Sequence, residues 1–213
     1  MAYKKNKFYK GLRKRARVYG RAGYQLYKDV KMLKGLVNTE VKVNDINQDI
    51  TVSSTMTVIP LSLVPEGTDY NERTGRKVRA KSIYLNAQVR INSSATATTF
   101  RYILFWDKDS DGESVTSAEL LQVANDLQSP LNYATAGSRF KILRDGNVDL
   151  SIDGQRVKTI KCFRRMGQHL TFLGDGSTTG SLGSGQVYMA LISNETTNVP
   201  DFNYYTRFRF IDN

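Results

Sequence analysis

Basic and aromatic side chains are concentrated in the first 34 residues, where together they could bind an anionic polymer. Twelve of the chain's 31 lysines and arginines lie there, against one acidic residue, Asp29. The twelve are Lys4, Lys5, Lys7, Lys10, Arg13, Lys14, Arg15, Arg17, Arg21, Lys28, Lys31 and Lys34. The aromatic residues among them are Tyr3, Phe8, Tyr9, Tyr19, Tyr24 and Tyr27. Cationic side chains neutralise phosphates, and aromatic rings stack on unpaired bases whatever their identity. The segment therefore predicts a site for single-stranded nucleic acid.

The excess charge of the chain lies entirely in this segment. The formal net charge is +11, from 31 basic and 20 acidic residues. Removing the twelve bases and one acid of residues 1–34 leaves 19 of each sign in the other 179 residues. An electrically neutral body can associate with copies of itself without charge repulsion, while the cationic segment attracts an anionic partner.

Other interpretations of the basic segment stay open. Arg13, Lys14, Arg15 and Arg17 form a run that also fits a nuclear localisation signal. A solvated tail without a specific partner would have a similar charge. A lipid surface fits less well, because residues 1–22 have no broad apolar face. We also expect no insertion into a membrane and no secretory leader, because the chain has no apolar run of about 18 residues and its start lacks an apolar core.

A short acidic run resembles the start of a calcium-binding loop. Asp107, Asp109 and Asp111 alternate as in an EF-hand, which then requires a bidentate acid at its twelfth position. That position is Ala118, and Glu119 follows one residue late. A plain acidic turn after a strand is therefore favoured over a calcium site.

Catalytic and metal chemistry has few candidate residues. The chain has one histidine, His169, and one cysteine, Cys162. A disulfide framework within the chain, a multi-cysteine zinc site and a histidine metal cluster are thereby excluded. We expect His169 to be structural at the start of a strand and Cys162 to be a small buried residue, and we predict no enzymatic activity and no cofactor.

Further basic residues occur in the remainder of the chain. They are Arg73, Arg76, Lys77, Arg79, Lys81, Lys158, Lys161, Arg164 and Arg165. Ion pairing with the acids of the body and additional contact with nucleic acid are both open for them.

The patterning predicts a basic arm at 1–44, partly helical over about 24–37, and a β domain at 45–213. Leu26, Val30, Leu33 and Val37 recur at helical spacing, whereas from about residue 49 apolar residues alternate with polar ones. Eight strands are indicated, with one short helix inserted after the capping box that begins at Thr116. The expected fold class is all-β, an eight-stranded antiparallel jelly-roll sandwich.

Two stretches carry a resemblance to a known family. They are 67–91, which starts Gly-Thr-Asp-Tyr-Asn-Glu-Arg-Thr-Gly, and 99–107, Thr-Phe-Arg-Tyr-Ile-Leu-Phe-Trp-Asp, followed by a turn, a helix and 139–145. Their order resembles single jelly-roll viral capsid (coat) proteins of the satellite tobacco necrosis virus type, and the capsids of Rep-encoding circular single-stranded DNA viruses. The resemblance covers roughly residues 45–165.

This resemblance implies a capsid subunit that self-assembles into an icosahedral, T=1-like shell of about 60 copies. The basic arm would point inward and hold a single-stranded genome, with DNA favoured over RNA because the arm mixes Arg and Lys with Tyr. The chain would be located in the virion, and in the host nucleus during assembly. Some members bind calcium between subunits, for which Asp212 is another candidate ligand.

Three other functions are compatible with parts of the sequence to different degrees. An RNA coat protein of the same fold is the nearest. A non-viral jelly-roll binding module would usually carry a signal peptide or disulfides. A cupin-like enzyme would need a histidine-rich metal cluster.

Overall fold

The computed structural model describes residues 23–30, 32–33 and 40–212. The chain divides into two units, residues 1–39 and residues 40–213. In the first unit, residues 23–30 and 32–33 are helical. Within this helix the Gln25 side-chain amide donates a hydrogen bond to Asp29 at 3.0 Å, one turn further on. All the strands among the described residues lie in the second unit.

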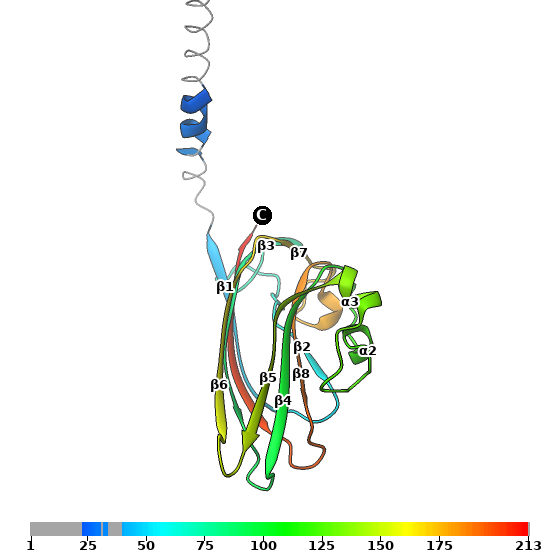
Figure 1. Cartoon of the computed structure of the whole chain (residues 1–213). Helices are drawn as coiled ribbons and strands as arrows, with labels where there is room; N and C mark the ends of the chain where they lie inside the picture. The colour runs from blue at the N-terminus through cyan, green and yellow to red at the C-terminus, as the bar shows by residue number, and fades with distance from the viewer. Residues whose placement is uncertain (1–22, 31, 34–39, 213) are drawn as a thin grey trace, which may run out of the picture. The chain divides into compact units, whose positions relative to one another are not determined.

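Two antiparallel sheets face each other in the second unit (Figure 1). The first contains β1 (Val41–Thr51), β9 (Asp201–Asp212), β3 (Lys77–Arg90) and β6 (Val157–Arg165) in that order, with the short β7 (His169–Thr171) also paired to β3. The second contains β2 (Thr57–Pro60), β8 (Gln186–Ser193), β4 (Ala97–Asp107) and β5 (Phe140–Ser151). Eight main strands in two four-stranded layers confirm the predicted jelly-roll sandwich.

The core forms where the alternating apolar residues of the two sheets meet. Along β9, Tyr204 and Phe208 are fully buried whereas Arg209 is exposed, so the strand presents one side to the core and the other outward. The rings of Phe100 on β4 and Phe202 on β9 stack with centroids 5.1 Å apart, which joins the two layers. Period-2 alternation therefore decides which residues of β3 and β9 fill the core, whereas β8 is buried at every position.

The connection between β4 and β5 holds two helices, not the single one expected. α2 (Ser117–Leu120) begins at Thr116, and the predicted capping box with Glu119 is present. α3 (Tyr133–Arg139) begins at Asn132, whose side chain accepts a hydrogen bond from the Ala134 backbone amide. The sequence of α3 is short, contains a glycine and lacks an apolar stripe, so periodicity could not reveal it. Figure 1 shows both helices on the side of the second sheet away from the first.

The first strand begins before the expected start of the β domain at residue 45. β1 begins at Val41, so residues 41–44, expected in the basic arm, pair with β9. The alternation is hidden there because the core-side residue is a lysine: Lys42 is buried and its ammonium lies 3.0 Å from the Asp212 carboxylate. Residues 140–151 form one strand, β5, whose pairing with β4 has a register irregularity between Leu104 and Phe105.

Candidate nucleic-acid interface

The basic arm lies largely outside the described residues. Of the twelve predicted nucleic-acid-binding residues, Lys28 is described, whereas Lys4 to Arg21, Lys31 and Lys34 are not. The nuclear-localisation run Arg13, Lys14, Arg15 and Arg17 also lies outside. The Lys28 ammonium lies over the Tyr24 ring, 4.9 Å from its centroid, one helical turn away. This cation–π contact places a phosphate-binding group and a stacking surface side by side.

The nine basic residues of the body named above divide into two that form ion pairs and seven that form none within the described chain. Arg73 is fully buried and bonds Glu66 at 3.0 Å and the Val64 carbonyl at 3.0 Å, with its guanidinium 4.2 Å from the Phe172 ring centroid. Arg76 lies 3.9 Å from Asp175 on the surface. Among the described residues, the other seven form no ion pair: Lys77, Arg79, Lys81, Lys158, Lys161, Arg164 and Arg165. Ion pairing with body acids therefore accounts for two of the nine.

Two of these seven cations lie in regular rows on the outward face of the first sheet, together with two arginines of β9. The register aligns Arg209 of β9 with Ser82 of β3 and Arg165 of β6. The next outward row joins Asp45, Arg207, Tyr84 and Phe163 across the four strands. The row after it joins Asn47, Tyr205, Asn86 and Lys161. Three adjacent rows thus present four cations, three aromatic rings and one carboxylate.

Asp45 holds Arg207 and Tyr205 in place on this face. Both guanidinium nitrogens Nε and Nη2 of Arg207 donate to the Asp45 carboxylate, at 2.8 and 2.6 Å, and the Tyr205 hydroxyl donates to the same carboxylate. The hydrogen bonds from Arg207 are the main reason that the pKa of Asp45 lies below its ordinary value. The hydrogen bond to Asp45 likewise raises the pKa of Tyr205. The Arg207 guanidinium is consequently fixed in orientation.

A hollow of about 270 Å³ lies on this face, lined by Tyr84, Phe163, Tyr205, Arg207 and Arg209. Sequence reasoning did not assign a role to Arg207 or Arg209. The missed signal was a tyrosine and two arginines at every second position of β9, Tyr205, Arg207 and Arg209. Its meaning depends on which strands lie beside β9.

The three calcium candidates at the end of β4, Asp107, Asp109 and Asp111, differ in burial and in hydrogen-bond partners. Asp107 is fully buried, and both of its carboxylate oxygens accept hydrogen bonds from Arg139, each at 2.9 Å. Asp109 is exposed, and the Asp111 carboxylate accepts a long hydrogen bond of 3.4 Å from the Glu113 amide. Asp107 is therefore a structural residue of an ion pair.

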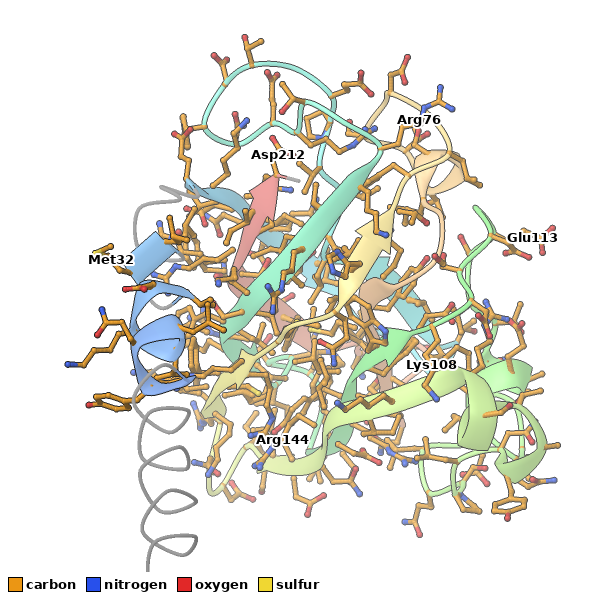
Figure 2. All side chains as sticks on the ribbon, turned by 90° about the horizontal axis from the view of Figure 1, so that it is seen from above. Met32, Arg76, Lys108, Glu113, Arg144 and Asp212 are labelled. Carbon is orange, nitrogen blue, oxygen red and sulfur yellow. The ribbon has the colours of Figure 1, made fainter. Side chains whose placement is uncertain are left out.

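Asp212 lies elsewhere in the body. Figure 2 shows it at the end of β9, on a different side from Lys108, which directly follows Asp107. Its carboxylate accepts hydrogen bonds from the Thr74 amide and hydroxyl and pairs with Lys42. Burial acts to raise the pKa of Asp212, but the bonds from Thr74 and Lys42 outweigh it and lower that pKa. The described residues hold no cluster of three or more His, Cys, Asp or Glu side chains suited to a metal. Calcium between subunits stays a prediction.

His169 and Cys162 lie where the sequence placed them. His169 is the first residue of β7 and is exposed. Cys162 is buried on the core side of β6, and that burial raises the pKa of its thiol.

In the described part of the chain, no helix has both the length and the apolar content needed to cross a membrane.

The chain is similar in sequence to viral coat proteins. The family model for the satellite tobacco necrosis virus coat protein matches residues 17–212. The capsid protein of Satellite tobacco necrosis virus 1 is 28% identical over 179 residues, which is 82% of this chain and 90% of that protein. Among solved structures, Desmodium yellow mottle tymovirus has 11% identity, a TM-score of 0.36 and coverage of 83% and 90% of the two chains. A 60-mer BFDV capsid protein has 6% identity, a TM-score of 0.35 and coverage of 83% and 95%.

Proposed function

We propose a function for this chain from the premise that it belongs to the satellite tobacco necrosis virus coat protein family and is a structural capsid protein of a virion. About 60 copies of the chain close into a T=1-like shell. The basic arm of each copy would hold a single-stranded genome inside, with DNA favoured over RNA. Binding would be independent of base sequence, because it depends on phosphate charge and ring stacking.

The observation that carries the proposal is the separation of charge along the chain. Residues 1–34 hold the whole net charge of +11, and the remainder is neutral. Sixty arms would therefore bring about 660 positive charges into one shell, enough to neutralise on the order of 700 phosphates. A neutral body lets the copies pack closely without opposing the assembly.

The basic run at Arg13, Lys14, Arg15 and Arg17 supports a nuclear step during assembly. Such a step suits a DNA genome. The same residues would then serve in transport before they bind the genome.

A charge-neutralised full-length chain tests the role of the arm. Replacing the nine bases from Lys4 to Arg21 with glutamine removes most of the arm's charge but keeps its length and the entire β body. We expect particles about 15–20 nm across by electron microscopy, with a 260/280 nm absorbance ratio close to that of protein alone. The matched control exchanges Lys for Arg and Arg for Lys at the same nine positions, and it should package nucleic acid normally.

Two results would count against the proposal. If the glutamine variant packaged as much nucleic acid as the natural chain, the role of the arm would be wrong. If the natural chain formed no closed particle, the shell itself would be wrong. Digestion of the extracted contents with deoxyribonuclease or ribonuclease decides between DNA and RNA.

A further inference from the structure

We infer that the outward face of sheet β1-β9-β3-β6 is a second nucleic-acid site, in which unpaired bases stack in the hollow between Tyr84, Phe163 and Tyr205. This inference rests on the proposed function, because it assumes that single-stranded nucleic acid lies against the capsid subunit. It adds a site on the folded body to the one proposed for the arm.

The orientation of the three rings follows from strand alternation. Tyr205 lies between Tyr204 and Thr206, which are both fully buried, so its ring is directed outward. Tyr84 and Phe163 are directly opposite each other on β3 and β6. Opposite residues of an antiparallel pair have Cβ atoms about 5 Å apart, so their rings are adjacent on one surface.

The exposed ring of Phe163 is not needed by the core. Its side-chain neighbours on the core side of β6, Cys162 and Ile160, are buried, whereas Phe163 is 48% exposed on an edge strand. Lys161, Arg165 and Arg209 on the same face are exposed as well. An apolar ring left open among cations is typical of a binding surface.

The charge of the face selects an anionic ligand. The three rows that surround the hollow carry Arg165, Lys161, Arg207 and Arg209 against one carboxylate, Asp45. Asp45 is occupied by Arg207, so the other three cations can contact phosphates. The outward side of β4 and β5 is different: there Arg101 pairs with Asp145, and Asp149 accepts a hydrogen bond from Thr99.

The shape and chemistry favour single-stranded nucleic acid over a protein partner. A hollow of about 270 Å³ lies just below the roughly 300–1,000 Å³ of pockets that enclose drug-sized molecules, which suits one planar base. Aromatic rings and the plane of an arginine guanidinium are the usual stacking partners of unpaired bases. Arg207 offers such a plane, because Asp45 holds its guanidinium by two nitrogens.

Binding of a fluorescent ten-nucleotide oligothymidylate to the unassembled full-length chain tests the site. We expect Phe163→Ala to weaken binding about tenfold, because one stacking contact is lost. Tyr133→Ala is the matched control: Tyr133 is 90% exposed, but it lies on α3, away from this sheet, and its loss should leave affinity unchanged. Thermal unfolding of both variants should match that of the natural chain.

The salt dependence separates stacking from charge. Phe163→Ala should leave the slope of log affinity against log salt unchanged. Lys161→Gln should reduce that slope by about 0.7, the value for one phosphate contact on a single strand. Photo-crosslinking with an iodouracil-containing oligonucleotide should label peptides that contain Phe163 or Tyr205.

The outcomes distinguish this site from the arm. Crosslinks confined to residues 1–34, with unchanged affinity in Phe163→Ala, would overturn this inference and leave the proposed function intact. Absence of any binding by the full-length chain would overturn both. If Phe163→Ala altered self-association in sedimentation velocity but not oligonucleotide affinity, the face would be a contact between subunits and the inference would fail.

Discussion

Arg139 and Asp107 form an ion pair in which two guanidinium nitrogens each lie 2.9 Å from a different carboxylate oxygen of a fully buried aspartate. Arg139 also pairs with Glu119 at 2.7 Å. Hydrogen bonds to Asp107 are the main reason that the pKa of Arg139 is raised above its ordinary value. This cluster joins the end of β4 to α2 and α3, which contain no long apolar stripe of their own.

Asp107→Asn should therefore destabilise the body strongly. Removal of one partner of a buried ion pair typically costs about 3–5 kcal/mol, and the remaining pair of Arg139 with Glu119 should keep the loss toward the lower end of that range. Urea unfolding, followed by tryptophan fluorescence, measures the change. Asp109→Asn is the control, because Asp109 is exposed two residues away and should unfold at nearly the natural urea concentration. Equal midpoints for the two variants would contradict a structural role for Asp107.

The ion pair between Asp45 and Arg207 should appear in the titration of the protein. Because hydrogen bonds from Arg207 lower the pKa of Asp45 in the folded state, the pair stabilises the fold above the ordinary aspartate pKa. That contribution is lost as the pH falls through the lowered pKa. Carboxyl NMR should show Asp45 titrating below the ordinary value of 3.8, and Arg207→Gln should return it toward that value. An unchanged Asp45 titration in Arg207→Gln would show that another group lowers its pKa.

Gly185 should be intolerant of any side chain. Its φ of +79° is unfavourable for other residues, and a Cβ atom there would lie 2.4 Å from the His169 carbonyl oxygen. Gly185→Ala should cost more than about 1 kcal/mol, because the strained backbone and the clash add. Gly167→Ala is the matched control, since a Cβ there meets nothing within 4 Å. Thermal unfolding compares the two, and a Gly185→Ala midpoint as high as that of Gly167→Ala would contradict this account.

The jelly-roll fold was predictable because the alternation of apolar and polar residues in a strand can be seen within a single short stretch of sequence. Ile83, Leu85, Ala87 and Val89 alternate with polar residues, and the structure buries all four. In such a strand the residues on one side are buried and those on the other side are exposed, so the period of the pattern assigns the core residues of β3. In β8, which is buried at every position, it does not. The capping box at Thr116 was visible for a similar reason, since its two partners are three residues apart.

The separation of charge between the first 34 residues and the remainder is also a property of the sequence alone. What tertiary structure decided is which distant side chains share a surface. Phe163 and Tyr205 are 42 positions apart, and they line one hollow because β3 pairs with both β6 and β9 in a particular register. Asp107 was only a weak calcium candidate from the sequence, and the structure shows Arg139, at the far end of α3, bonded to both of its carboxylate oxygens. Such partners are chosen by long-range strand pairing, which a one-dimensional pattern of residue types does not encode.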